Sequence, residues 1–378
     1  MRKVKFIFGL LLVISLPVLA QKNSYSIVGT ITDHDGMYVK MQNKETNVKM
    51  DSTIIVNGKF QFRGHTDTAM LVMVNTEDWS MNHTLLIQSG TNLSIDATNA
   101  TVRGDRPSAQ LNQQIEKLKA LKTKQQQVAR QAVRVLDEDK VKYDSLVAIY
   151  DDYTQQMKDY VDSAGWLLYE ANAENKIGGE ILLNIAYVLT RGIDLYNEAP
   201  TPAILRLLSN YASASPVVKN HKDLSRFMQN VSTQIQVKTG SPFRDFEAVD
   251  YATGKQTTLG AVITGHVAVV DFWASWCGPC RREIEKTLKP LYMKYADSGL
   301  VVVGVDIWDN IENHDEAVKE MGITYPQLID TDRNNSSLLY GIPAVPRVFL
   351  IDRNGIILGY FRGEELLNAV EKALITSE

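Results

Sequence analysis

The stretch that decides the fold of this 378-residue chain is DFWASWCGPC, residues 271–280, which holds its two cysteines, Cys277 and Cys280. The apolar, β-branched segment HVAVVDFW leads into it, and a helical pattern follows as far as Tyr295. The order of strand, C-x-x-C and helix makes the cysteine pair informative, whereas the pair alone would be a weak signal. Its chemistry depends on the compartment in which the protein works.

The first twenty residues, MRKVKFIFGLLLVISLPVLA, place three basic residues before an apolar run and end in small residues. This pattern is typical of a secretory signal peptide, so we expect cleavage after Ala20 and export to the periplasm, or to the cell envelope if the leader is retained. The apolar run from Phe6 to Leu16 is short for a membrane span. The net charge of −4 becomes −7 without these twenty residues, which carry three basic and no acidic groups, and this argues against nucleic acid as a partner.

Exported proteins commonly use paired cysteines as structural bridges. A disulfide between Cys277 and Cys280 would enclose two residues and remove little entropy from the unfolded chain, so redox chemistry is the better reason for the pair. A zinc site would need four ligands, and none of the six histidines pairs with another at ligand spacing. We therefore expect no metal, and no cofactor other than a redox-active disulfide.

Residues 24–103 alternate apolar and polar side chains, with turn signals at Asp35-Gly36 and Asn57-Gly58. This pattern predicts a β-sandwich or a small barrel. From Ser108 the apolar residues recur at threes and fours, which predicts long amphipathic helices packed as hairpins.

Thr201-Pro202 predicts an N-cap and first turn of a further helix, and the helical pattern should end near Gln234. Tyrosine and methionine stripes at helical spacing are typical of packing, and residues 22–235 show no catalytic motif.

Beyond Thr239-Gly240-Ser241-Pro242 the chain alternates short β-branched runs with helical patterns, which predicts a sheet with helices on both faces. Residues 352–355, DRNG, predict a closing hairpin. The expected organisation is a signal peptide at 1–20, a β-sandwich-like domain at 22–105, a helical region at 106–238 and an α/β domain at 241–378.

The position of Cys277 at a helix N-terminus places it among unpaired backbone N–H groups and the positive end of the helix dipole, which favour a thiolate. We therefore expect Cys277 to be the nucleophile, and Cys280, one turn later, to resolve a mixed disulfide. Gly278 leaves the front of the turn open. Pro279 suits the first turn, where its missing N–H costs little.

Residues 241–376 resemble the TlpA/ResA-like extracytoplasmic thiol-disulfide oxidoreductases, which have the thioredoxin fold. The matching pieces are SPFRDFEAVDYATGKQTTL, VAVVDFWASWCGPCRRE, VVVGVDI and GIPAVPRVFLIDRNG. The segment DSTIIVNGKFQFRG also resembles the amino-terminal β-domain that such proteins carry in Bacteroidetes. The resemblance implies an α/β fold class, with a thioredoxin-like C-terminal domain preceded by an antiparallel β-domain and an α-helical region.

The resemblance also implies site residues. Asp271 matches the buried carboxylate that relays a proton for the resolving thiol, although a strand-end residue facing solvent is the alternative. Val345-Pro346 matches the family's cis-proline segment, which orients an incoming peptide, although an edge-strand proline would look the same. Glu283 matches an acidic residue near the active site, or it complements its own helix dipole. We expect Trp276 to cover one side of the thiol and contact substrate, whereas Trp273 should lie in the core.

Three departures from the family stand out. Arg347 replaces the usual threonine after the cis-proline, which would change the charge of the accepted substrates. No lysine in VVVGVDIW pairs with Asp271, and the helix proline, Pro290, lies ten residues after Cys280, so a displaced kink is expected.

Two other functions compete with a disulfide oxidoreductase. A peroxiredoxin would need proline and threonine where this chain has Val270 and Ala274. A binding protein that keeps the thioredoxin-like part as a scaffold is the alternative from another class, and the intact cysteine pair argues against it.

The Gly-Pro between the cysteines resembles reducing thioredoxins, so we expect a reductase of disulfides in exported proteins, recharged by an integral-membrane electron donor. Apocytochrome c, in cytochrome c maturation, is one such substrate among several. The β and helical regions are expected to supply substrate recognition, homodimerisation or both.

Overall fold

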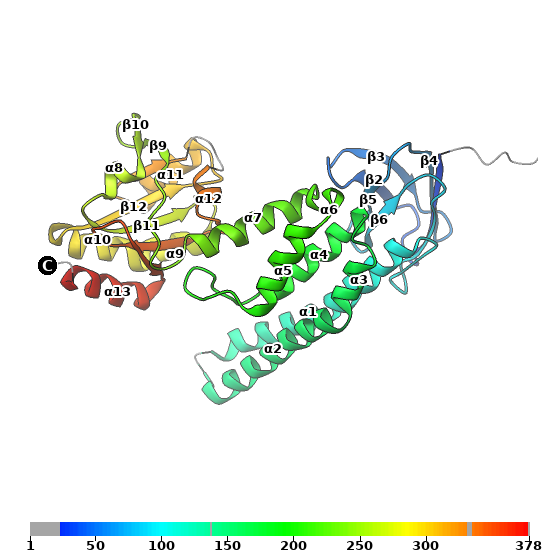
Figure 1. Ribbon diagram of the computed structural model, residues 1–378, viewed down its shortest axis with the longest axis horizontal. Helices are drawn as coiled ribbons and strands as arrows, with labels where there is room; N and C mark the ends of the chain where they lie inside the picture. Colours follow the sequence, from blue (N-terminus) through cyan, green and yellow to red (C-terminus); the bar gives the residue numbers. More distant parts are fainter. Residues whose placement is uncertain (1–22, 137, 331–334, 377–378) are drawn as a thin grey trace, which may run out of the picture. The chain divides into compact units, whose positions relative to one another are not determined.

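The computed structural model describes residues 23–136, 138–330 and 335–376 (Figure 1). The signal peptide expected at 1–20 lies outside them. Contacts divide the chain into two compact units, Met1–Ala120 and Leu121–Glu378, and each is described by itself. Within the described ranges, no helix has the length and apolarity that crossing a membrane requires.

The first unit contains a β-sandwich of two four-stranded sheets, in the orders β4-β1-β7-β8 and β3-β2-β5-β6. Alternate residues of the strands face inward and form one apolar core that includes Ile27, Phe62 and Leu85. Most neighbouring strands are antiparallel, as predicted, but β1 and β7 run parallel. The strands are β1 (Ser24–Thr30), β2 (Tyr38–Asn43), β3 (Lys49–Ile54), β4 (Lys59–His65), β5 (Met70–Thr76), β6 (Asn82–Ile87), β7 (Asn92–Asp96) and β8 (Thr101–Arg103).

The turn predicted at Asn57-Gly58 is present, with φ angles of 50° and 67°. The Asp35 carboxylate accepts hydrogen bonds from both backbone N–H groups, at 3.1 and 2.6 Å. The two strands that this turn joins, β3 and β4, lie in different sheets, and an isolated bridge between Val56 and Lys59 flanks the turn. The local turn was therefore predictable, whereas the sheet to which each strand belongs was not.

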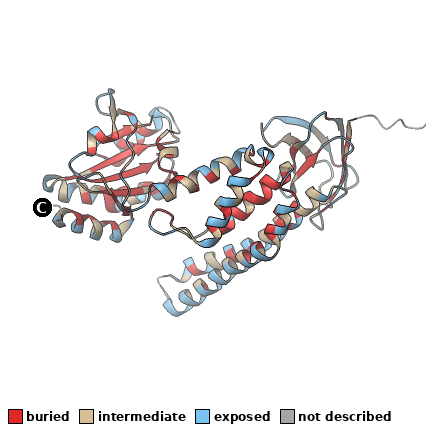
Figure 2. Cartoon of the chain, viewed as in Figure 1, coloured by how far each residue is buried: buried red, intermediate tan, exposed pale blue. Residues whose placement is uncertain are grey.

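The helical region begins with α1, which spans the boundary between the two units. Its most buried helix is α4, whose residues are mostly inaccessible to solvent (Figure 2). Thr201 is the N-cap of α5, as predicted, because its side chain accepts a hydrogen bond from the N–H of Ile204. The helices are α1 (Arg106–Val135), α2 (Lys140–Tyr160), a π-helical turn η1 (Val161–Gly165), α3 (Trp166–Glu170), α4 (Lys176–Leu189), α5 (Pro202–Ser213), α6 (Pro216–Lys219) and α7 (Lys222–Gln236).

The C-terminal part forms a seven-stranded sheet in the order β10-β9-β13-β12-β11-β14-β15. The strands β11, β12 and β13 are parallel, and β14 and β15 close the sheet as the predicted antiparallel hairpin. The strands are β9 (Glu247–Asp250), β10 (Gln256–Thr258), β11 (Val267–Trp273), β12 (Leu300–Asp306), β13 (Gln327–Ile329), β14 (Arg347–Ile351) and β15 (Ile357–Tyr360). The helices are α8 (Leu259–Ile263), α9 (Gly278–Glu283), η2 (Ile284–Leu288), α10 (Lys289–Tyr295), η3 (Ala296–Ser298), α11 (Ile311–Met321), α12 (Asn335–Leu339) and α13 (Gly363–Thr376).

This sheet separates two apolar cores, and Figure 1 shows it between α13 on one side and α8 on the other. Every residue of β11 is buried, because its side chains alternate between the two cores. Val269 and Trp273 face the core under α9 and α13, whereas Val270 and Phe272 face the core under α8. The α/β, thioredoxin-like fold and the core position of Trp273 are therefore confirmed.

The loop before β14 packs tightly against α7. Gly341 has φ of +62°, and a Cβ there would lie 2.7 Å from the carbonyl oxygen of Asn230 and 3.0 Å from the backbone nitrogen of Gln234. Backbone atoms cannot move away as a flexible side chain would, so this position requires glycine.

We expect Gly341→Ala to lower the free energy of unfolding by about 2–5 kcal/mol, because it combines a left-handed backbone with steric overlap. Gly322→Ala is the matched control, because Gly322 has nearly the same φ, +58°, and nothing within 4 Å of its added Cβ. The control should lose about 1–2 kcal/mol. Urea unfolding followed by tryptophan fluorescence measures both, and equal losses would contradict the close packing of α7 on this loop.

Candidate functional site

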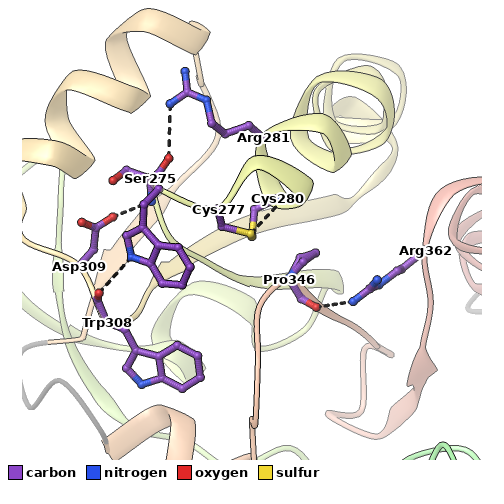
Figure 3. Close-up of a disulfide and its surroundings, with 9 residues drawn as sticks. Ser275, Cys277, Cys280, Arg281, Trp308, Asp309, Pro346 and Arg362 are labelled. Atoms are coloured by element: carbon purple, nitrogen blue, oxygen red, sulfur yellow. Dashed lines mark hydrogen bonds between the residues drawn. A yellow bond between two sulfur atoms is a disulfide. The ribbon is translucent and has the colours of Figure 1, made fainter. Parts of the chain in front are cut away.

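The two cysteines form a disulfide at the point where β11 gives way to α9 (Figure 3). Cys277 is the N-cap of α9, and its Sγ accepts a hydrogen bond from the backbone N–H of Cys280 at 3.1 Å. Cys277 keeps 4% of its surface exposed, whereas Cys280 is completely buried. An attacking group from another protein can therefore reach Cys277 before it reaches Cys280.

The first turn of α9 is open toward solvent. Gly278 and Pro279 are exposed, and Pro279 lies in the first turn, where no helical N–H is needed. A Cβ added at Gly278 would meet only Arg282 Nη1, at 3.7 Å. The packing of the chain thus does not require glycine here, and the space in front of the turn is free.

The helix that follows has a wide turn in place of a simple proline kink. Pro290 has no N–H to donate, and the residues before it, Ile284–Leu288, form a π-helical turn. The Lys289 N–H accordingly bonds the carbonyl of Ile284, five residues back. Pro290 therefore follows a π-helical turn, and the displaced kink stays a prediction.

The loop after β12 holds the segment in front of the cysteines. Asp309 accepts a hydrogen bond from the N–H of Ser275 at 2.6 Å, and the Trp276 indole donates to the Trp308 carbonyl at 3.2 Å. Trp276 nevertheless remains 61% exposed, so its ring is available for contact with another molecule. The sequence analysis missed Trp308 and Asp309, although the carboxyl ends of adjacent parallel strands meet at one edge of a sheet and could have indicated them.

Asp271 lies inside the protein on the dithiol side of β11. It is completely buried, and neither carboxylate oxygen has a hydrogen-bond partner. Burial, and secondarily the negative charge of Glu283, raise the pKa of Asp271 well above its ordinary value, while Arg362 opposes this shift. The alternative of a strand-end residue facing solvent is wrong.

Glu283 is half-buried and caps α13, because its Oε1 accepts a hydrogen bond from the Gly363 N–H at 2.9 Å. It therefore ties the cysteine helix to α13 and places a negative charge close enough to influence Asp271. Tyr325, which the sequence analysis missed, is also buried beside Asp271, whose charge adds to burial in raising the pKa of this tyrosine.

The bond between Val345 and Pro346 is cis, as the family resemblance implied. Val345 is half-buried and packs against the core that contains both cysteines. The Pro346 carbonyl accepts a hydrogen bond from Arg362 Nη2 at 2.7 Å. In the view of Figure 3, Pro346 lies between the disulfide and Arg362, and the loop of Trp308 and Asp309 lies on the other side of the disulfide.

Arg347 was expected to change the charge of the accepted substrates, but its side chain packs on the side of the sheet away from the cysteines. Its guanidinium lies 5.7 Å from the centroid of the Tyr196 ring and 4.7 Å from that of Tyr360. These contacts belong to the opposite core, because successive residues of a strand face opposite sides and the next residue, Val348, packs on the dithiol side. Arg347 therefore contacts aromatic rings of its own chain.

No group of three or more histidine, cysteine or acidic side chains with the geometry to hold a metal ion occurs in the ranges that the structure describes. The groups that the structure brings together at the site are the two sulfurs, the buried carboxyl and backbone N–H groups.

Two family models match different parts of the chain. Residues 238–374 match the Redoxin family, and residues 25–128 match a domain of unknown function, DUF4369. The second match covers the β-sandwich and most of α1.

Two curated relatives match the C-terminal part. The thiol-disulfide oxidoreductase ResA of Geobacillus thermodenitrificans is 31% identical over 140 residues, which is 36% of this chain and 78% of that protein. The thiol:disulfide interchange protein HelX of Rhodobacter capsulatus is 31% identical over 110 residues, or 29% of this chain and 60% of HelX.

Solved structures match over a similar share of the chain. The thioredoxin domain of a thiol-disulfide oxidoreductase from Bacteroides vulgatus is 29% identical, with 35% of this chain and 96% of that chain covered and a TM-score of 0.33. A thiol:disulfide interchange protein from Chlorobium tepidum is also 29% identical, with 35% and 95% covered and a TM-score of 0.31.

The cysteine pair at a helix N-terminus, the buried carboxyl beneath it and the identity to ResA over most of that protein's length lead to one conclusion. The chain belongs to the TlpA/ResA-like family of thiol-disulfide oxidoreductases.

Proposed function

We propose that this protein reduces disulfides of exported proteins outside the cytoplasm, with Cys277 as nucleophile and Cys280 as resolving thiol. The observation that carries the proposal is the asymmetry of the pair. Cys277 keeps 4% of its surface exposed and accepts a helix N–H, whereas Cys280 is completely buried on the side of the sheet that holds Asp271. The redox-active pair would need no further cofactor.

The reaction begins with the reduced protein. The Cys277 thiolate, stabilised by the helix N-terminus, attacks a substrate disulfide, forms a mixed disulfide and releases one substrate sulfur, which takes up a proton. Cys280 then loses its proton and attacks Cys277, which releases the second substrate sulfur and leaves the protein disulfide. The substrate gains two electrons, and the cysteine pair loses two.

We propose that Asp271, which is buried on the same side of β11 as Cys280, takes the proton of Cys280. A carboxyl with a raised pKa binds and releases protons closer to neutral pH than an ordinary aspartate does, which suits transfer to and from a thiol. Glu283 contributes by its charge, which raises the pKa of Asp271 further. Its role is therefore electrostatic, with no direct contact to the reacting sulfurs required.

The substrate would bind across the exposed front of the dithiol. The open space at Gly278, the exposed Pro279 and the exposed ring of Trp276 support contact on one side. Val345-Pro346 would supply the other side, where an extended peptide can pair with backbone groups.

The Gly-Pro sequence between the cysteines supports reduction as the direction, because it resembles that of reducing thioredoxins. The strongly oxidising type has Pro-His between its cysteines, and its reduced form is favoured. A reductase outside the cytoplasm must be recharged, and we propose an integral-membrane electron donor. For the regions before residue 239 we propose substrate recognition or homodimerisation. A role as a binding scaffold is less well supported, since the dithiol, Asp271 and the cis-proline are all in place.

Insulin reduction by dithiothreitol tests the proposed activity. The full chain should accelerate precipitation of the insulin B chain, and Cys277→Ser should abolish the acceleration because it removes the nucleophile. Cys280→Ser should instead accumulate a covalent complex with substrate, visible on non-reducing gels and absent with Cys277→Ser. A Cys277→Ser protein as active as wild type would show that this site does not reduce disulfides.

Asp271→Asn should raise the stability of the protein at high pH and lower its activity. Because the folded-state pKa is raised, the folded protein binds a proton that the unfolded chain releases above about pH 4, so stability falls as the pH rises from there. The variant, which cannot ionise, should therefore resist urea better than wild type at pH 8, with a difference that shrinks toward pH 4.

The same variant should resolve the mixed disulfide about 100- to 10,000-fold more slowly, the scale of lost acid-base catalysis. Asp306→Asn is the matched control, because Asp306 is also buried, with a pKa raised to about 8, but lies on β12. Unchanged resolution in Asp271→Asn, measured by stopped flow, would remove the proposed proton transfer.

The direction of the reaction is tested by equilibration with dithiothreitol buffers. We expect a reduction potential closer to the value of about −270 mV for thioredoxin than to that of about −120 mV for the strong oxidant DsbA. A value near −120 mV would make the protein an oxidant and contradict the proposed direction.

A further inference from the structure

Tyr196, from the loop between α4 and α5, contacts the segment that carries the cis-proline. The tyrosine is 2% exposed, and its hydroxyl lies 3.0 Å from the carbonyl oxygens of both Tyr340 and Gly341. A tyrosine hydroxyl keeps its proton at neutral pH and remains a donor, and burial raises the pKa of Tyr196 further. These contacts hold the chain five and six residues before Pro346.

The ring of Tyr196 contacts the other end of the same segment. It packs edge-on against Phe349, with ring centroids 5.1 Å apart, and the Arg347 guanidinium lies 5.7 Å from its centre. Arg347 directly follows Pro346 in the sequence. One buried side chain from the helical region therefore contacts the chain on both sides of Val345-Pro346.

Neighbouring residues strengthen this attachment. Gln234, on α7, donates a hydrogen bond to the Gly341 carbonyl at 2.7 Å. The side-chain amide of Asn197 donates to the Tyr360 carbonyl at 2.9 Å and accepts from the Tyr360 N–H at 3.2 Å, so it binds both backbone groups of this β15 residue. The absence of a side chain at Gly341 lets α7 approach closely.

Arg347 completes the contact. Its guanidinium lies near the rings of Tyr196 and Tyr360, and its Nε, although buried, has no hydrogen-bond partner. The two aromatic rings attract this cation through cation–π interaction. The arginine that follows the cis-proline therefore has a packing partner in Tyr196, which comes from the helical region.

We propose that Tyr196 is a positioning residue for the cis-proline segment, so that the helical region sets how well the thioredoxin-like domain binds a protein substrate. The inference rests on the proposed function, in which substrate lies along Val345-Pro346. When the cis-proline segment spends a smaller fraction of the time in the conformation that binds substrate, its apparent affinity for substrate falls in proportion to that fraction.

The test uses the full chain with the substitution Tyr196→Phe, which removes the hydroxyl and keeps the ring. We expect the KM for oxidised insulin to rise about threefold to tenfold with kcat nearly unchanged, the factor that corresponds to one lost hydrogen bond. The rate constant with the small disulfide 5,5′-dithiobis(2-nitrobenzoate), which needs no pairing with the cis-proline segment, and the reduction potential should stay at wild-type values.

Tyr187→Phe is the matched control, because Tyr187 lies on α4, is 56% exposed and packs against Phe227. It should leave both reactions unchanged. An unchanged KM for insulin in Tyr196→Phe, or an equal loss with both substrates, would overturn the inference and leave the proposed function intact. Failure of the wild-type chain to reduce insulin, with the small disulfide still reduced, would overturn the proposed function and this inference together.

Discussion

The burial of β11 on both faces is the constraint on which the rest of the site depends. Its alternate side chains complete the two cores of the C-terminal sheet, so the strand cannot shift in register without exposing one set. That fixed register carries Asp271 into the dithiol-side core and delivers Cys277 to the start of α9. The relation between carboxyl and cysteine pair thus follows from the packing of one strand.

The burial of Asp271 lowers the stability of the fold and at the same time raises the pKa of a carboxyl near the cysteines. A buried carboxyl without hydrogen-bond partners costs free energy, and the protein limits the cost by keeping the group protonated over a wider pH range. Glu283 increases the cost, because its negative charge raises the pKa of Asp271 while its Oε1 caps α13. Such a cost in the core is understandable under the proposed role, in which the carboxyl exchanges a proton with a thiol.

The helical region also contributes to the architecture of the site. Tyr196 and Gln234 contact the loop that leads to the cis-proline, and Asn197 pairs with β15. The thioredoxin-like sheet therefore has an edge and a loop whose partners come from outside it. The unusual Arg347 has an explanation in these contacts, since it packs on rings from both regions.

The sequence by itself determined the elements whose signals are local. The apolar run of β11, the cysteine pair, the N-cap at Thr201 and the turn at Asn57-Gly58 could all be read from neighbouring residues, because caps and turns satisfy nearby backbone groups. The cis-proline and the proposed role of Asp271 came from family resemblance, since neither composition nor spacing identifies them.

The tertiary structure alone decided the rest. It showed that α4, apolar on nearly all sides, is a central helix without the polar face that a periodic pattern needs. It also showed that Asp309 holds Ser275, and that Arg347 faces Tyr196, about 150 residues earlier, across the second core. Contacts between distant segments depend on how sheets and helices pack, and no local pattern of side chains encodes which distant residue will fill a given space.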